Sequence, residues 1–129
     1  MDRPVSTQEI SEAYGISRNH LVRVAQTLQS HSFVKASVGR SGGLTLSRDP
    51  SEINIGQVVR KTEPNFRIVE CFEPKTNTCK ISPVCRMRGV LAEALSAFIH
   101  VLDGYTLADV ARVEGNAPLT NFLAIQKAK

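Results

Sequence analysis

Three cysteines in one short segment are the residues of this chain best suited to chemistry. Cys71, Cys79 and Cys85 follow one another as C-x7-C-x5-C, and the sequence contains no other cysteine. An odd number cannot pair completely into internal disulfides. The sequence shows no secretory signal and no long apolar run, so we expect reduced thiols in a cytoplasmic protein with no membrane partner. Clustered reduced cysteines are typical of metal sites.

The segment between these cysteines is predicted to be a loop, because it contains Pro74, Asn77 and Pro83. Such a loop can wrap three thiolates around one centre. Three thiolates leave one position open in a tetrahedral zinc site or in a cubane of four irons. No histidine lies at a finger-like spacing from the cysteines, so the fourth ligand stays open. Three unrelated buried thiols are the alternative.

Two short helices joined by a glycine-containing turn are predicted near the N-terminus. Ser6 and Glu9 form a capping-box pattern before a helix that ends at Gly15, and Ser17 is placed to cap a second helix. The expected apolar positions are Ile10, Ala13 and Tyr14 in the first helix and Leu21, Val24, Ala25 and Leu28 in the second. This pattern is typical of a helix-turn-helix unit that binds DNA.

A hairpin is predicted next, with strand-like runs at 33–38 and 44–47 and a glycine-rich turn at 39–43. Arg40 at the tip is suited to a minor groove, which favours a guanidinium group. The span 17–48 contains five basic residues and no acidic one, which fits a phosphate-binding surface or, equally, a solvated basic face. The predicted DNA-binding residues are Ser17, Arg18, Asn19, His20, Arg23, Arg40, Ser41 and Gly42.

A short helix is expected after Asn54, and a long amphipathic helix from about Val84 to a stop at Gly104. A further short helix is expected from Thr106, and an apolar run lies at 119–125. The apolar stripe of the long helix is wider than one small domain needs, which favours pairing with a second copy; packing within the chain is the alternative. The residues assigned to dimerisation are Met87, Leu91, Ala94, Leu95 and Phe98.

The predicted fold is therefore mainly α with a small β-hairpin. Residues 1–50 form a winged helix-turn-helix, residues 51–85 a connecting helix and cysteine loop, and residues 86–129 a long dimerisation helix with a C-terminal tail. No nucleophile lies in a pattern with a base and an orienting group, so an enzyme is not expected.

Motifs in three regions of the chain resemble one known family. They are VECF at 69–72, PVC at 83–85, LAEAL at 91–95, LDGYTLAD at 102–109, ISRNHL at 16–21 and the wing GRSGGL at 39–44. Together they resemble the iron-sulfur winged-helix regulators of the NsrR, IscR and RirA group, and the last two motifs are most similar to the NsrR branch.

The resemblance implies a homodimeric repressor that binds a palindromic operator in double-stranded DNA and carries an iron-sulfur cluster responsive to nitric oxide. Cys71, Cys79 and Cys85 would hold a 4Fe-4S cluster, with a 2Fe-2S cluster as the alternative. IscR-type members place a histidine ligand where this chain has Arg88. NsrR-type members take a fourth ligand from an aspartate on an N-terminal helix of the partner subunit. We expect this chain to begin after that helix, because residues 1–4 lead almost directly into the capping box. Asp2 is not at a matching position.

Two other functions remain open at this level. A RirA-type regulator would report iron supply in place of nitric oxide. A zinc-stabilised interaction module would use the same thiols and have no role at DNA.

Overall fold

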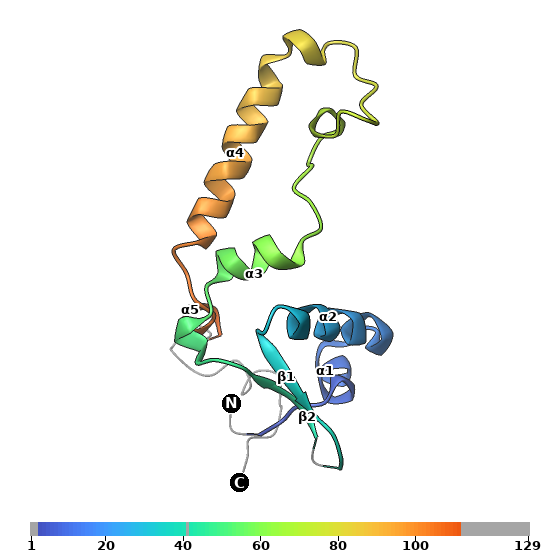
Figure 1. Cartoon of the computed structure of the whole chain (residues 1–129), viewed down its shortest axis with the longest axis vertical. Coiled ribbons are helices and arrows are strands. Elements are labelled where there is room, and N and C mark those ends of the chain that lie inside the picture. Colours follow the sequence, from blue (N-terminus) through green and yellow to red (C-terminus); the bar gives the residue numbers. More distant parts are fainter. Residues whose placement is uncertain (1–2, 41, 112–129) are drawn as a thin grey trace.

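The computed structural model describes residues 3–40 and 42–111. Its elements are the helices α1 (Thr7–Tyr14), α2 (Arg18–Ser30), α3 (Ile55–Thr62), α4 (Arg86–Leu102) and α5 (Leu107–Val110), the strands β1 (Val34–Ser37) and β2 (Gly43–Leu46), and the 3-10 helices Pro50–Glu52, Glu70–Phe72 and Ser82–Val84 (Figure 1). The predicted fold class, mainly helical with a small hairpin in a winged helix-turn-helix, is confirmed.

The helix-turn-helix forms where its capping residues lie. The Ser6 hydroxyl accepts from the Glu9 N–H at 3.1 Å and starts α1. Gly15 ends α1 in the left-handed conformation, at φ 69°, which costs a glycine little. The Ser17 hydroxyl accepts from the His20 N–H at 3.4 Å and starts α2.

A capping box also requires the Glu9 side chain to accept from the Ser6 backbone N–H, and this part of the prediction was wrong. The Glu9 carboxylate accepts from the guanidinium of Arg3 at 3.0 Å instead of returning to Ser6. Arg3 brings a full positive charge within reach, and a charged donor binds a carboxylate more strongly than a backbone N–H does.

The wing is an antiparallel hairpin in which Val34 lies opposite Leu46 and Ser37 lies opposite Gly43. Val5 adds a bridge on the other edge of β2, since its N–H and carbonyl bind Leu44 at 3.0 and 2.8 Å. A Cβ at Gly43 would lie 2.7 Å from the carbonyl carbon of Val5, so glycine is what allows this approach. The sequence pattern did not reveal the bridge, because a single paired residue leaves no periodicity.

The core of this region is small. Val5, Ala25 and Phe33 are buried, whereas Tyr14 is 51% and Val24 39% exposed. The prediction that Tyr14 and Val24 belong to buried stripes was therefore wrong for the described residues. The two helices contact each other and the hairpin over only part of their apolar surface.

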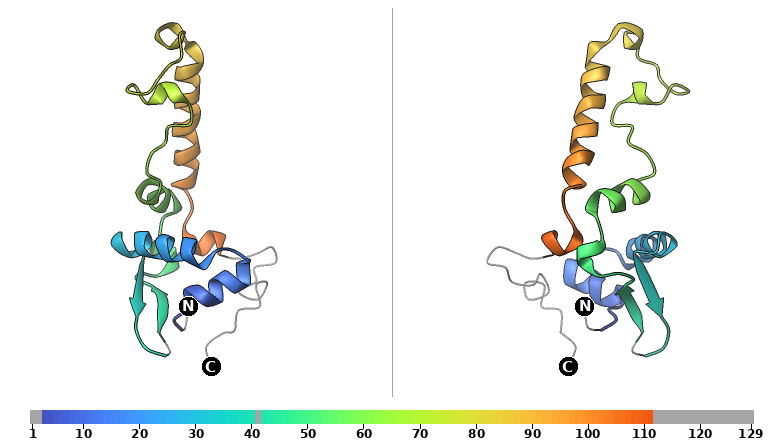
Figure 2. Two further views of the ribbon diagram at one scale, coloured as in Figure 1. Left: turned by 90° about the vertical axis from the view of Figure 1, so that its right-hand side faces the viewer. Right: turned by 60° about the vertical axis from the view of Figure 1, so that its left-hand side comes forward.

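The second half of the described chain consists of α3, the cysteine segment, α4 and α5. The helix predicted after Asn54 forms as α3, and Asn54 caps it by accepting from the Gln57 N–H at 3.0 Å. The long helix α4 leads away from the winged helix and carries the cysteine segment at its far end (Figures 1 and 2). Thr106 and Asp109 form the predicted capping box at α5. The predicted apolar run at 119–125 lies outside the described residues.

Candidate metal centre and DNA-binding surface

All three cysteines lie on the segment that joins α3 to α4. Cys71 is the middle residue of the 3-10 helix Glu70–Phe72, Cys79 lies in the loop that follows, and Cys85 is the residue from which α4 starts. Each thiol is free and half-buried. The segment thus presents three unoxidised soft ligands at one end of the molecule.

The loop around Cys79 is ordered by side chains that are not cysteines. The Asn77 amide oxygen accepts from the Cys79 N–H at 3.0 Å, and its nitrogen donates to the Ser82 hydroxyl at 2.9 Å. The Ser82 hydroxyl in turn donates to the Cys79 carbonyl at 3.1 Å. This is the local turn chemistry that asparagine favours, and it fixes the backbone beside the middle cysteine.

The described residues 3–40 and 42–111 contain no group of three or more His, Cys, Asp or Glu side chains placed to hold a metal ion. The predicted wrapping of three thiolates around one centre is therefore not formed in this conformation. The donor set nonetheless fits a soft metal or an iron-sulfur cluster, since thiolates are the ligands such groups prefer.

The acidic residues beside Cys71 already have partners. The Glu70 carboxylate accepts from the Thr78 hydroxyl at 3.0 Å, and the Glu73 carboxylate forms an ion pair with Arg67. These contacts link Glu70 to Thr78 across the first part of the loop and Glu73 to Arg67 just before it.

The residues predicted to bind DNA lie at the start of α2 and at the tip of the wing. The structure leaves exposed Ser17, Arg18, Asn19, His20, Arg23 and Arg40. Gly42 is half-buried in the hairpin turn, where its N–H donates to the Gly39 carbonyl at 3.1 Å. Ser41 lies outside the described residues. Beside Arg40, Val38 is 99% exposed.

Another basic residue of this region has a different role. The Arg48 guanidinium lies over the ring of buried Phe33, 5.3 Å from its centroid. A cation at this distance is attracted by the face of the ring. Arg48 therefore supports the small core from outside.

The apolar residues of α4 divide between two faces. Met87 and Phe98, assigned to dimerisation, are more than half exposed, as are Val90 and Val101, which had not been assigned. The remaining assigned residues are Ala94, which is exposed, and Leu91 and Leu95, which are half-buried. Leu95 faces a cavity that is open to the surface.

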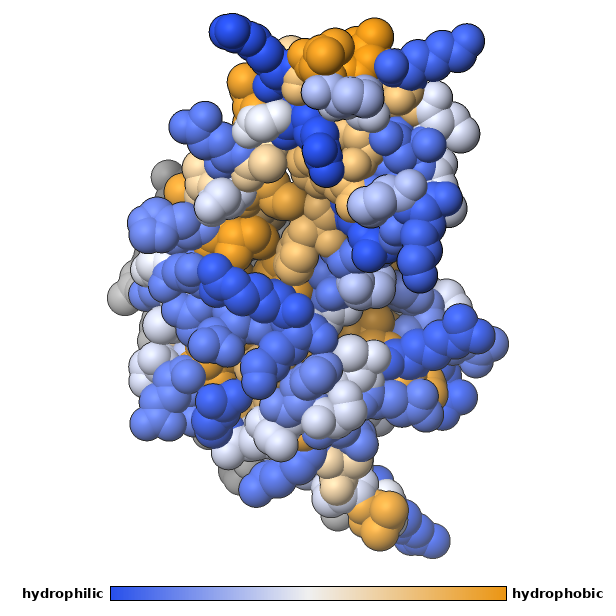
Figure 3. Space-filling model, turned by 45° about the horizontal axis from the view of Figure 1, so that its top comes forward, coloured by the Kyte–Doolittle hydropathy of each residue, from blue (hydrophilic) through white to orange (hydrophobic). Residues whose placement is uncertain are grey.

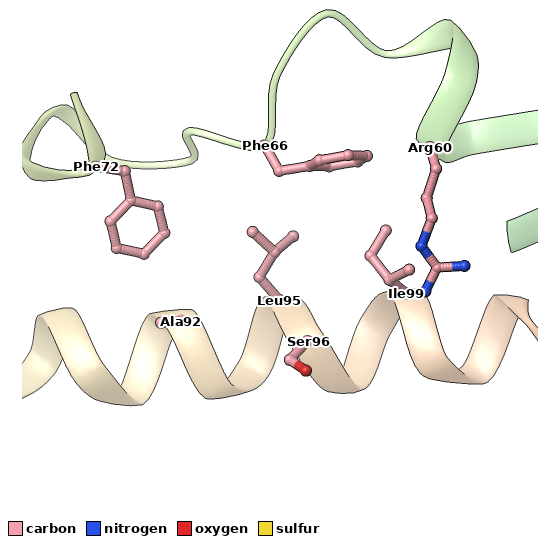
Figure 4. A pocket seen from close by; sticks show the side chains of 7 residues that line it. All are labelled: Arg60, Phe66, Phe72, Ala92, Leu95, Ser96 and Ile99. Carbon is pink, nitrogen blue, oxygen red and sulfur yellow. The ribbon is translucent and has the colours of Figure 1, made fainter. Parts of the chain in front are cut away.

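That cavity has a volume of about 480 Å³ and lies between α4 and the segment leading to Cys71. Phe66 and Phe72 stand over α4, and Arg60 lies beside Ile99 at one end (Figure 4). The remaining lining residues are Ala92, Leu95 and Ser96. Apolar side chains also reach the surface in patches between hydrophilic ones when the cysteine end faces the viewer (Figure 3). This half of the described chain is thus loosely packed.

An ion pair at the base of α4 was not found from the sequence. The Arg60 guanidinium donates to both carboxylate oxygens of Asp103, with Nη2 to Oδ2 at 2.7 Å. Hydrogen bonding to Arg60 lowers the pKa of Asp103, and the same contact raises the pKa of Arg60. The two residues are 43 apart in the chain, so no spacing rule connects them.

A match to a protein-family model decides the family. The Rrf2 model, described as iron-dependent transcriptional regulator, matches residues 1–113. The chain belongs to the Rrf2 family.

Relatives of known name agree with this assignment. Two proteins named HTH-type transcriptional regulator NsrR are similar to this Rrf2 chain. That of Bacillus subtilis is 51% identical over 105 residues, which cover 81% of this chain and 72% of the relative. That of Geobacillus kaustophilus is 43% identical over 122 residues, covering 95% and 82%. These relatives are transcriptional regulators, so the expectation that the chain is not an enzyme is confirmed.

Solved structures show the same fold. T. potens IscR is similar with a TM-score of 0.64 and 25% identity, covering 98% of this chain and 77% of IscR. CymR, titled the global cysteine regulator of B. subtilis, is similar with a TM-score of 0.63 and 27% identity, covering 84% and 78%. Within the described residues of this Rrf2 protein, no helix combines the length and apolarity needed to span a membrane.

Proposed function

We propose that this Rrf2 regulator is a cytoplasmic, homodimeric transcription repressor whose iron-sulfur cluster senses nitric oxide. The observation that carries the proposal is the set of three free, half-buried cysteines on the single segment between α3 and α4. The names of the NsrR relatives support nitric oxide over other signals, and the family description supports an iron cofactor.

Cys71, Cys79 and Cys85 are the residues that would hold the cluster. When bound, an iron-sulfur cluster supplies iron atoms that react with small diatomic molecules, provided one position is not closed by a tight ligand. This chain contributes three thiolates, and the Arg67–Glu73 and Thr78–Glu70 contacts hold the loop that carries them. We favour a 4Fe-4S cluster, with 2Fe-2S as the alternative.

The winged helix would bind the operator through two elements. Arg18, Asn19 and His20 lie in the first turn of α2, where a recognition helix contacts base edges. Arg40 extends from the wing, where a guanidinium suits a narrow minor groove. The absence of acidic residues between 17 and 48 favours approach to phosphate.

The exposed face of α4 would pair with its copy around a two-fold axis. Met87, Val90, Phe98 and Val101 are each more than half exposed. Together with Ala94, which is also exposed, they recur at spacings of three and four residues along the helix. A two-fold dimer of winged helices reads two half-sites, so the operator is expected to be palindromic.

Anaerobic purification tests the proposal most directly. We expect a brown protein whose visible absorption and paramagnetic spectra change on addition of nitric oxide, with loss of operator binding in the same titration. A colourless protein containing zinc would show that the thiols serve a zinc-stabilised module. A cluster inert to nitric oxide but lost under iron limitation would assign the RirA-type function.

A further inference from the structure

Asp103, at the end of α4, is held by both ends of α3. Its carboxylate accepts from Arg60 in the last turn of α3, and its backbone carbonyl accepts from the Asn54 side-chain nitrogen at 2.7 Å. Asn54 is also the residue that caps the start of α3. One residue therefore receives donors from the N-cap and from the last turn of a neighbouring helix.

Gly56 sets how closely the two helices approach. It is buried, and a Cβ built on it would lie 1.8 Å from Oδ1 and 3.0 Å from Cα of Asp103. Any larger residue at 56 would push the carboxylate out of its place against Arg60. We call these four residues, Asn54, Gly56, Arg60 and Asp103, the Asp103 joint.

Backbone hydrogen bonds cross the chain at the same place. The Ile55 N–H donates to the Tyr105 carbonyl at 2.9 Å, and the Leu107 N–H donates to the Ile53 carbonyl at 2.8 Å. Ile53 itself is 2% exposed. The joint is thus fixed by side chains on one side and by a short antiparallel bridge on the other.

The position of the joint in the fold gives it a role. The span 61–102 leaves α3 and returns along α4 to Asp103, and it contains all three cysteines. In the opposite direction, Asn54 is connected to wing strand β2 only by the short span 47–53, which includes the 3-10 helix Pro50–Glu52 (Figure 1). The joint is where the cysteine segment meets the DNA-binding unit.

We propose that the Asp103 joint is a positioning element that transmits the state of the cysteine segment to the winged helix. The inference rests on the proposed cluster. The three thiols are not gathered in the described conformation, so binding them to one centre must move Cys71 and Cys79 relative to Cys85 at the start of α4. Because α3 and α4 are clamped at Asp103, that movement changes the orientation of α3 and of the wing connected to it.

The Arg60–Asp103 ion pair is better suited to orient α3 against α4 than to stabilise the fold. Side chains of Arg60 and Asp103 are 45% and 32% exposed, and an ion pair this exposed contributes little to folding. A guanidinium bound to both oxygens of a carboxylate nevertheless defines an angle, which a single contact does not. Weakening the joint should therefore leave the fold intact and change the coupling between the cysteine segment and operator binding.

The first test uses the apoprotein and needs no cluster. In Asp103→Asn we expect hydrogen exchange at the amides of Ile55 and Leu107 to accelerate about tenfold, because local opening of the joint becomes easier. The Val5 amide, bonded to Leu44 in the wing, serves as the internal reference and keeps its rate. Unchanged rates at Ile55 and Leu107 would show that the joint does not depend on Asp103 and would overturn the inference.

The second test measures coupling as the ratio of operator Kd without and with the cluster, at one salt concentration. For Asp103→Asn, Arg60→Gln and Gly56→Ala we expect an unchanged visible spectrum and a ratio within about threefold of one, since couplings between sites are typically 5–150-fold. Arg60→Lys keeps one contact and should give an intermediate ratio. Glu9→Gln is the matched control, because the Arg3–Glu9 pair is equally exposed but lies within the winged helix.

The outcomes separate this inference from the proposed function. A wild-type protein with no cluster, or with equal affinity in both states, would refute the proposed function, and the exchange experiment would still decide whether Asp103 holds the joint. A wild-type ratio well above one that persists in Arg60→Gln and Gly56→Ala would overturn the inference alone. The inference would also be overturned if the Kd ratio of Glu9→Gln fell toward one as far as that of the joint variants. If Asp103→Asn does not fold, Arg60→Gln and Gly56→Ala provide the test.

Discussion

The winged helix and the cysteine half of the molecule are held together in different ways. In the winged helix, Ser6 and Ser17 cap the two helices and Val5 pairs with β2. These elements are therefore held by contacts within the chain. Beyond α3, within the described residues, Ile99 is the one buried residue of the longest helix, and Met87, Val90, Phe98 and Val101 face outwards.

This difference indicates where each half obtains its stability. The longest helix has one buried residue, Ile99, and leaves a wide apolar face exposed. We therefore propose that a second copy and a cluster stabilise the cysteine half. The experiments below test that dependence from the largest expected effect to the smallest.

Replacing any one cysteine should produce the largest effect. Cys71→Ser, Cys79→Ser and Cys85→Ser each exchange a soft thiolate for a hydroxyl that binds iron poorly at neutral pH, so visible absorption should be lost almost completely. Operator affinity should fall with it, as measured by fluorescence anisotropy. Lys80→Ser, on the same loop, is the control and should keep the full spectrum. A cysteine whose replacement leaves the spectrum intact is not a ligand.

Charges on the free face of α4 should separate the dimer. Val90→Glu with Phe98→Glu would place four carboxylates in a two-fold interface, where unpaired buried charges cost about 3–5 kcal/mol or more. Sedimentation should show monomers, and helical circular dichroism should be retained because both side chains are already exposed. Gly89→Glu is the control, since a Cβ there meets nothing within 4 Å. A wild-type apoprotein that is monomeric at micromolar concentration would refute the dimer.

The sequence predicts the local contacts of the winged helix better than the long-range contacts of the cysteine half. Caps at Ser6, Ser17, Asn54 and Thr106 act within four residues, so their spacing in the sequence was enough to place the helices they start. The hairpin also follows from local turn chemistry. The helix-turn-helix pattern already predicted DNA binding, and the clustered cysteines already predicted a metal site. The family motifs add the expectation that the metal group is an iron-sulfur cluster.

The long-range contacts could not be predicted. Arg60 and Asp103 are separated by the whole cysteine segment, and nothing in the sequence connects Gly56 to a carboxylate. The exposure of Tyr14 and Val24 depends on what covers the helices, which periodicity does not specify. The three thiols are not gathered within the described residues, and the proposed cluster would set their final arrangement.

Wing variants should have moderate effects that are confined to DNA binding. Arg40→Ala should weaken operator binding by about 1–3 kcal/mol and reduce the salt dependence of log K by about 0.9, because one phosphate or groove contact is lost. Val38→Ser changes the neighbouring exposed residue without removing charge, so its salt dependence should match wild type. Equal affinity of Arg40→Ala and wild type at one salt concentration would remove the wing from the interface. Melting curves of both variants should overlap the wild type.

The smallest expected effect is the pH dependence of the Asp103 joint. Hydrogen bonding to Arg60 lowers the pKa of Asp103, and the positive charges of Arg60 and His100 act in the same direction. A carboxyl whose pKa is lower in the folded state stabilises the fold above its unfolded pKa, and this contribution disappears as pH falls through the folded value. The difference in unfolding free energy between wild type and Asp103→Asn should therefore stay constant around neutral pH. It should shrink only in acid, below the ordinary carboxyl range of about 4. Urea titrations of the apoprotein at several pH values measure this difference, and high salt should reduce it because the pair is exposed. A difference that stays the same through the acid range would mean that the carboxylate charge is not what holds α3 to α4, leaving the Asn54 contact and the backbone bridge to do so.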